Sequence, residues 1–390
     1  MKKSFLPLLA LITMASCTQN DMDLKESNDQ SEIKLSSAVG SIAQTRTSYD
    51  LTTPTTAVPF EATVLVSKVA NLYPAANLLN GSAYKVIFTD ATTPTGFSDG
   101  TNPTPVYYPA DGTDVYLWGL YPYGKCVTTS PAASEWLIGG GGATAQYTFT
   151  GKEDVMYAPE IKSNKTEVKT AVNYANTKLN FKHLLTKLIV KAKGDAAAVS
   201  AFGDITDITL VAVGAAAPTA NIANKVKIDL GTDATLATPA THAFTGTEAS
   251  FPFYIYDVLT TPATPTQTNN AFAALTSGTT PAAITVPLST DYANGQEIAY
   301  SMVQPIDVAA PGGTTAYLLK VKTTKGEAAG FNVPVVLKDA TSTSGTPVEF
   351  TGSTASKTFT IQLTFSAAEI KSIVAVGQWV PQGNSDIEIQ

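Results

Sequence analysis

Arginine is almost missing from this sequence: Arg46 is the only one, and 24 lysines carry the rest of the positive charge. Charged residues make up only 15% of the 390 residues, and the net charge is -7. A nucleic-acid surface needs clustered Lys or Arg, because its affinity depends on counterion release. No such cluster occurs in the sequence. The composition therefore argues against a nucleic-acid partner, and it leaves the single arginine to be explained.

Cysteine and histidine are also scarce. Cys17 and Cys126 are too few for a disulfide framework, and we expect Cys126 to be a free thiol. His183 and His242 lie far apart in sequence, and no HExxH, GxSxG, GxxxxGK[ST], CxxC or EF-hand pattern is present. His183, inside an apolar run, is expected to be a core residue. We therefore expect no metal, no cofactor and no enzymatic activity.

Three weaker signals of chemistry remain. Glu153, Asp154 and Asp257 offer carboxylates for glycoside hydrolysis, but the sequence does not give their separation. The run Gly139 to Gly142 lacks the Lys-Ser/Thr of a phosphate-binding loop and is interpreted as a flexible loop. An aromatic stripe could stack on sugars, although aromatic residues in strands more often belong to the core. The stripe consists of Tyr116, Trp118, Tyr121 and Tyr123.

The first 16 residues have the pattern of a signal peptide. Lys2 and Lys3 precede an apolar stretch from Phe5 to Met14, which is too short to span a bilayer. The small residues that follow end at Cys17, as in a bacterial lipobox. We expect residues 1–16 to be removed and Cys17 to be acylated, which would anchor the chain to the outer membrane. The alternative is an ordinary signal peptide with a chance cysteine.

Residues 17–46 read as a lipidated propeptide with two parts. The first, "TQNDMDLKESNDQSE", is polar and without periodicity, which is typical of a flexible tether. In the second part, Ile33, Leu35 and Val39 alternate with polar or small residues, which predicts a half-buried strand. This strand ends shortly before Arg46.

The rest of the chain consists of short β-type runs separated by Gly- and Pro-rich turns, such as 60–69, 83–88, 114–123 and 357–365. The segment 178–194 is the most apolar continuous stretch. Its run from Leu184 to Val190 favours a central strand, with a short helix as the alternative. A change of composition at 194–204 suggests two β-sandwich domains, residues 47–198 and 199–390. Ser366 lies three residues before Glu369, a capping-box spacing that predicts a short helix over 366–373.

Four segments carry a resemblance to a known family: "VYYPADGTDVYLWGLYPYG" (106–124), "GKEDVMYAP" (151–159), "LNFKHLLTKLIVKAKG" (179–194) and "TFTIQLTFSAAEIKSIVAVGQWVPQG" (358–383). In this order they resemble the fimbrillin-like lipoproteins of Bacteroidales, the type V pilins with their tip and anchor relatives. The resemblance implies a mostly β chain with two transthyretin-like antiparallel β-sandwich domains in tandem. It also implies that an arginine-specific surface protease removes an N-terminal strand, which opens a groove for a strand from a neighbouring subunit.

Applied to this chain, the resemblance makes Arg46 the cleavage site and Thr47 the first residue of the mature protein. Ile33, Leu35 and Val39 then belong to the removable strand. The segment 381–390 is the candidate donor strand, because Ile387 and Ile389 alternate with polar neighbours as Ile33 and Leu35 do.

The expected partners are other pilin subunits and the protease, and the expected location is the outer-membrane surface and then the fimbrium. Two alternatives stay open, a fimbrial tip adhesin and a glycan-binding lipoprotein that never polymerises. The receptor is not indicated by the sequence.

Overall fold

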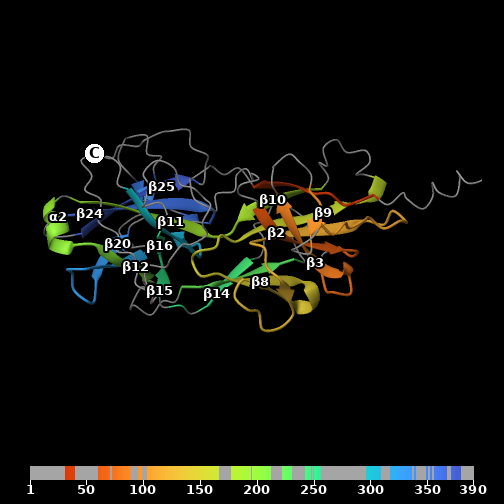
Figure 1. The fold of residues 1–390 in the computed structure, drawn as a ribbon, viewed down its shortest axis with the longest axis horizontal. Helices are drawn as coiled ribbons and strands as arrows, with labels where there is room; N and C mark the ends of the chain where they lie inside the picture. The colour runs from red at the N-terminus through yellow and green to blue at the C-terminus, as the bar shows by residue number, and fades with distance from the viewer. Residues whose placement is uncertain are drawn as a thin grey trace, which may run out of the picture.

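The computed structural model describes residues 31–39, 60–70, 73–88, 95–98, 103–166, 177–194, 196–211, 222–230, 242–246, 248, 250–255, 296–308, 317–335, 338–339, 348–349, 352–353, 355–366 and 370–378. This part of the chain is mostly β and forms several sheets (Figure 1). The molecule is elongated, with the N-terminal strands gathered at one end and the C-terminal strands at the other. The α-helix α2 (Ala196–Phe202) lies wholly within the described residues, at the end of the molecule where the C-terminal strands gather.

A seven-stranded sheet organises the N-terminal half. The sequence of its central strand β2, FEATVLVS, is buried at nearly every residue because both faces of the sheet are covered. Val64 and Val66 contribute to the core on one face, and Leu65 contributes to the core on the other. In spatial order the strands are β1 (Ser36–Val39), β10 (Lys178–His183), β9 (Met156–Ser163), β5 (Val115–Tyr121), β2 (Phe60–Ser67), β3 (Leu78–Phe88) and β4 (Phe97–Ser98).

A five-stranded sheet packs on one face of this sheet and draws its strands from both halves of the chain. Its order is β14 (His242–Thr245), β13 (Lys225–Asp229), β8 (Thr144–Thr148), β7 (Trp136–Gly139) and β6 (Cys126–Val127). A short 3-10 helix, η1 (Gly140–Gly142), connects β7 to β8. β13 pairs antiparallel with β8 from Lys225↔Thr148 to Asp229↔Thr144. The two halves of the chain therefore share one sheet.

The C-terminal half has two larger sheets around a common core. One contains β16 (Tyr254–Ile255), β17 (Gln296–Val303), β11 (Thr186–Gly194), β24 (Lys357–Phe365) and β25 (Ile370–Gln378). The other contains β15 (Ser250–Pro252), β12 (Ile205–Val211), β19 (Tyr317–Thr323) and β20 (Phe331–Val335). Two small pairs are β18 (Asp307–Val308) with β23 (Gly352–Ser353), and β21 (Lys338–Asp339) with β22 (Val348–Glu349).

The helix α2 closes one end of this core through an aromatic contact. The Phe202 ring meets Phe331 and Phe365 edge-on, with centroid distances of 5.2 and 5.8 Å. Such edge-to-face arrangements are favoured by the aromatic quadrupole. The helix thereby joins one strand of each of the two larger C-terminal sheets.

The chain changes sheets between His183, the last residue of β10, and Thr186, the first residue of β11. The apolar segment 178–194 is therefore two strands in two different sheets. Its second part is a central strand, as the sequence predicts, because β11 lies between β17 and β24. The domain boundary expected at 198/199 falls within α2, so β11 lies on the N-terminal side of that boundary while pairing only with C-terminal strands.

The structure differs from the sequence expectations in two further respects. Not every strand pair is antiparallel, because β1 with β10, β6 with β7 and β11 with β24 are parallel. Of these parallel pairs, β11 and β24 are more than 160 residues apart in sequence, whereas β6 and β7 are joined by only the eight residues 128–135. The helix predicted over 366–373 is wrong for residues 370–373, which belong to β25 and pair with β24.

Candidate functional site

The segment Ser31–Val39, predicted as the removable strand, is bound at an edge of the N-terminal half and contacts three distant parts of the chain. Leu35 and Thr95 exchange two backbone hydrogen bonds, of 2.9 Å and 2.8 Å. The Ile33 N–H donates to the Val106 carbonyl at 2.7 Å. At the start of the segment, the carbonyl of Ser31 accepts a 3.0 Å hydrogen bond from the N–H of Tyr108.

The second part of the segment is strand β1, which pairs in parallel with β10. The register runs from Ser36↔Lys178 to Val39↔Phe181. The hydroxyl of Thr177, just before β10, donates to the Lys34 carbonyl at 2.6 Å and links the two parts. The predicted strand residue Val39 thus takes part in the ladder at the edge of the seven-stranded sheet.

The side chains of the segment show which sequence pattern fits this sheet edge. Ile33 and Leu35 are both 0% exposed, whereas Glu32 and Lys34 between them are half-buried. Ser36 and Ser37 are buried at 5% and 1% exposure, so these two positions hold only small side chains. The pattern is polar and apolar in alternation followed by two small residues. We call this edge, with the backbone groups of Thr95, Val106, Tyr108 and β10, the strand slot.

An aromatic core lies under the strand slot. Phe60 stacks on Tyr121 at 4.7 Å and meets Phe181 edge-on at 4.7 Å between ring centroids. Gly119 permits this packing, because a Cβ there would lie 2.6 Å from Cζ of Phe181. Ile33 and Leu35 belong to the same core, whose other buried members are Ala62, Val64, Val66, Leu79, Tyr84, Val86, Phe88, Phe97, Val106, Tyr108, Val115, Leu117, Met156, Ala158 and Leu179.

Electrostatics contribute little to this site. Within the described residues of the segment, one ion pair joins Lys34 to Glu32 at 3.6 Å, and both side chains are partly exposed. Such pairs contribute between 0 and about 1 kcal/mol. Apolar burial and backbone hydrogen bonds therefore hold the segment, which is the chemistry of strand addition.

The two histidines lie in different sheets and do not form one site. His183 is a core residue, as predicted, with Nδ1 hydrogen-bonded to Oδ2 of Asp154 and both residues almost fully buried. The carbonyl of His183 accepts a 2.5 Å hydrogen bond from the Ser356 hydroxyl. His242 is on β14, with its ring edge-on to Phe244. The buried Asp154–His183 pair thus lies where the chain changes sheets.

The carboxylates considered for glycoside hydrolysis have structural partners. Asp154 is the partner of His183, and Glu153 accepts 2.8 Å hydrogen bonds from the N–H and hydroxyl of Thr150. Asp257 lies outside the described residues. Within the described ranges, no group of three or more His, Cys, Asp or Glu could hold a metal ion. No helix among those residues has the length and apolar character to cross a membrane.

The aromatic stripe does not form one exposed platform. Trp118 is fully buried in the core shared with the five-stranded sheet, while Tyr121 is buried in the core under the strand slot, on the other face. Tyr116 and Tyr123 are half-buried. The side chains therefore alternate between two faces, as strand geometry dictates.

Several predicted site residues lie outside the described part of the chain. These are the lipidation site Cys17, the cleavage pair Arg46 and Thr47, and the donor residues Ile387 and Ile389. Conversely, sequence analysis missed Thr95, Val106 and Tyr108, which hydrogen-bond the segment. They lie in the turn-rich stretch before β5, where only the alternation of buried Val106 and Tyr108 with exposed Tyr107 gives a local signal.

A comparison with known proteins identifies the family of this chain. A scan against models of protein families matches residues 64–379 to the family described as fimbrillin-like. The chain belongs to the fimbrillin-like family. This is a family of non-enzymatic structural and adhesion proteins of the cell surface. The match confirms the resemblance drawn from the four sequence segments and the expectation that the protein is not an enzyme. No curated protein matches the chain.

Solved structures that the chain is similar to come from Bacteroides and Porphyromonas species. A candidate cell adhesion protein from Bacteroides uniformis is 14% identical, with 90% of this chain and 98% of that chain covered and a TM-score of 0.45. A fimbrial protein from Bacteroides vulgatus is also 14% identical, with 90% and 100% covered and a TM-score of 0.38. The tip fimbrial protein Mfa3 from Porphyromonas gingivalis is 9% identical, with 90% and 100% covered and a TM-score of 0.33.

Proposed function

We propose that this fimbrillin-like protein is a structural subunit of a type V pilus that assembles by donor-strand exchange and mediates adhesion. In this proposal the chain is exported as a lipoprotein acylated on Cys17 and held at the outer membrane. An arginine-specific surface protease cuts after Arg46, and the mature protein begins at Thr47. The segment before the cut then leaves the strand slot, and a strand of a neighbouring subunit replaces it.

The observation that carries the proposal is the way Ser31–Val39 is bound. Two fully buried side chains, Ile33 and Leu35, anchor a segment that otherwise makes backbone contacts at a sheet edge. Burying two such side chains stabilises the bound state by about 3–6 kcal/mol. After cleavage, these noncovalent contacts alone would hold the segment, so a competing strand with the same pattern can displace it.

An empty strand slot would be a liability for the mature protein. Its backbone groups at Thr95, Val106 and Tyr108 and the outer edge of β10 would lose their partners, and apolar core would be exposed. A neighbouring subunit that supplies a strand restores both. Because slot and donor are different surfaces, such contacts need not close into a ring and can continue into a filament.

The segment 381–390 is the donor that the sequence favours. Ile387 and Ile389 would occupy the positions of Ile33 and Leu35, with Asp386 and Glu388 at the two half-buried polar positions. Gln390 would then fall at the position of Ser36, so this segment matches the alternation but not the two small residues that follow it. The partners would be copies of this chain or accessory pilins. The tip fimbrial protein from Porphyromonas gingivalis, to which the chain is similar, is consistent with such partners.

The domain organisation belongs to the same proposal. Two transthyretin-like β-sandwich domains in tandem, preceded by the signal peptide (1–16) and the propeptide (17–46), account for the two clusters of sheets at the ends of the molecule. The change of sheets between His183 and Thr186 favours a boundary there over the one expected at 198/199. The shared sheet of β8 and β13 would join the two domains.

A tip adhesin is the second candidate, because a tip subunit would accept a strand without donating one. The same slot serves both candidates, and only the role of 381–390 differs. The glycan-binding alternative loses its main support, since Trp118 and Tyr121 are buried on opposite faces of the sheet.

Limited proteolysis tests the proposal. The purified precursor is treated with an arginine-specific protease and followed on native gels and by mass spectrometry. We expect one cut, after Arg46, followed by a ladder of oligomers; Arg46→Ala should give uncut monomers. A variant lacking residues 386–390 separates stalk from tip, because it should still lose its own N-terminal strand but should not donate one. A cut precursor that stays monomeric with its N-terminal segment released and wild-type tail present would refute strand exchange between copies.

A further inference from the structure

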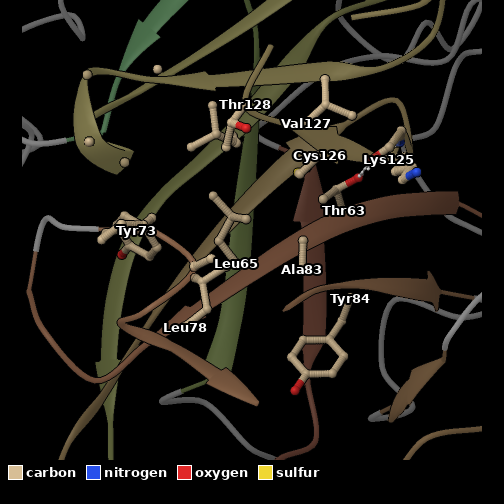
Figure 2. Close-up of a pocket in the computed structure, with 18 of the residues that line it drawn as sticks. Thr63, Leu65, Tyr73, Leu78, Ala83, Tyr84, Lys125, Cys126, Val127 and Thr128 are labelled. Carbon is tan, nitrogen blue, oxygen red and sulfur yellow. Dashed lines mark hydrogen bonds between the residues drawn. The ribbon is translucent and has the colours of Figure 1, made fainter. Parts of the chain in front are cut away.

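A hollow lies in the N-terminal half, between the seven-stranded sheet and the sheet of β6, β7 and β8 (Figure 2). Its volume is about 730 Å³, within the range of small-molecule sites. Leu65, Leu78 and Ala83 form its floor on β2 and β3, while Ile138 and Val127 lie on the opposite sheet. Neither the strand exchange nor the family assigns a role to it.

The wall of the hollow is held open by a close backbone contact. Gly142, with φ of +92°, lies so near the turn after β2 that a Cβ would be 2.0 Å from Pro74 N and 2.3 Å from Tyr73 C. The N–H of Tyr73 donates to the Gly142 carbonyl at 3.0 Å, and the Tyr73 hydroxyl donates to Glu160 at 2.6 Å. The glycine run predicted as a flexible loop is thus one anchored wall of a pre-formed hollow.

Two of the polar side chains that line the hollow, Thr63 and Tyr84, already have hydrogen-bond partners. The Thr63 hydroxyl donates to the Gly124 carbonyl at 2.8 Å and accepts from the Gly124 N–H at 3.0 Å. The Tyr84 hydroxyl donates to the Leu79 carbonyl at 2.9 Å. A saccharide, which needs many hydrogen bonds, would gain few here. The interior favours an apolar ligand body instead.

One end of the hollow carries a positive charge. Lys125 is exposed and forms no ion pair within the described part of the chain, and Figure 2 shows it beside Cys126, at the end opposite Tyr73. Burial raises the pKa of the Cys126 thiol to about 12, so this group is neutral at physiological pH. The wall beside the lysine is therefore uncharged, and Lys125 supplies the cation.

We propose that this hollow binds an amphipathic anion, a molecule with an unbranched apolar chain and one anionic head that pairs with Lys125. Such an acyl chain occurs both in free fatty acids and in anionic lipids. Leu65, Leu78 and Ile138, which line the hollow, belong to the core on the other face of the sheet from Ile33 and Leu35. Ligand binding here does not depend on strand exchange, and the two proposals can be tested separately.

The first test is the chain-length dependence of binding. The full chain, carrying Cys17→Ser so that it is not acylated, is titrated calorimetrically with octanoate, decanoate and dodecanoate below their micelle concentrations. Each buried methylene contributes about 0.8 kcal/mol, so affinity should rise about fourfold per methylene until the hollow is filled. Saturable one-to-one binding with this dependence is expected. Absence of binding, or affinity independent of chain length, would overturn the proposal.

The second test locates the ligand. The Ala83→Phe variant places a large side chain in the floor of the hollow. The Ala75→Trp variant places one at its opening. Because Ala75 lies in an exposed turn, this second variant should fold even if Ala83→Phe does not. Each should weaken dodecanoate binding at least tenfold. Ala76→Trp is the matched control, since Ala76 is equally exposed in the same turn but does not line the hollow. Equal binding by Ala75→Trp and Ala76→Trp would place the ligand elsewhere and refute the site.

The third test concerns the anionic head and its source. Lys125→Glu should weaken dodecanoate binding about fivefold, as expected for the loss and reversal of an exposed charge pair, while Lys227→Glu on the exposed face of β13 should not. Dodecyltrimethylammonium should bind the Lys125→Glu variant more tightly than the wild type. If the substitution changes neither the dodecanoate affinity nor the dodecyltrimethylammonium affinity, the role of Lys125 is contradicted. Co-sedimentation with phosphatidylglycerol vesicles that is lost in Ala75→Trp identifies a lipid as the source; binding of dodecanoate alone identifies the free acid.

Discussion

Leu35 and Thr95 exchange two backbone hydrogen bonds, Leu35 N–H to Thr95 O at 2.9 Å and Thr95 N–H to Leu35 O at 2.8 Å. This antiparallel bridge fixes the register of the N-terminal segment before it turns into the parallel ladder with β10. Any strand that replaces the segment has to offer its backbone to Thr95 at a residue whose side chain is buried. The bridge therefore selects donors by register as well as by composition.

Leu35→Ala should destabilise the precursor by about 2–5 kcal/mol, because Leu35 is fully buried and its removal leaves a cavity. Urea unfolding measures the change. Lys34→Ala is the control on the same segment, since that side chain is partly exposed, and it should cost no more than about 0.5 kcal/mol. Equal losses for both variants would mean that the side chains do not anchor the segment.

Thr95→Pro should weaken the binding of the cut segment to the rest of the protein. Proline has no N–H, so the hydrogen bond that the Leu35 carbonyl accepts from Thr95 is lost. The protein is nicked at Arg46 and passed over a gel-filtration column, and the bound fraction of the segment is measured by mass spectrometry. Thr95→Ser keeps the N–H and should behave as wild type. If Thr95→Pro retains the segment as well as Thr95→Ser does, the bridge does not set the register.

The Asp154–His183 pair should be strongly coupled. Removing one partner from a buried, hydrogen-bonded pair costs about 3 kcal/mol or more, so Asp154→Ala and His183→Ala should each destabilise the chain by that amount. The double variant should lose at least about 1 kcal/mol less than the sum. A cycle of urea unfolding curves measures this coupling. If the two single losses add up to the loss of the double variant, the two side chains do not stabilise each other. Glu153→Ala, combined with His183→Ala in the same way, is the control at the neighbouring position.

Cys126 should react slowly with alkylating agents. Burial raises its thiol pKa to about 12, against about 8.5 in an unfolded chain, so at pH 8.5 the folded protein holds on the order of a thousandfold less thiolate. The raised pKa stabilises the fold fully below about pH 8.5, and this contribution is lost as the pH rises toward 12. Iodoacetamide labelling of the Cys17→Ser chain, folded and in urea, measures the ratio. Similar rates in both states would contradict the raised pKa of this half-buried thiol.

Sequence patterns predicted individual strands correctly where the residues of the strand itself determine the structure. Period-2 alternation marked Ile33 and Leu35, and dense β-branched sequence marked β2 and β24. The predicted helix failed because a cap from Ser366 and Glu369 contributes only about 1 kcal/mol, whereas the strand formed by the following residues pairs with β24 from Lys357 to Phe365.

What the sequence did not reveal is long-range. Nothing near Thr95 or Val106 indicates that the N-terminal segment binds there, because the contact joins stretches about 60 and 70 residues apart and depends on loop geometry. The break between β10 and β11 was hidden for a related reason. Leu184 and Leu185 continue the apolar run, although the chain changes sheets at that point.

The ladder between β8 and β13 has a mechanical consequence. Because β8 comes from the N-terminal half and β13 from the C-terminal half, pulling the two ends of the molecule apart would load this ladder as well as the covalent crossing after His183. The pairs from Lys225↔Thr148 to Asp229↔Thr144 would have to yield together, in addition to the packed side chains around them. A molecule built in this way resists extension at its middle through backbone hydrogen bonds as well as through the covalent chain.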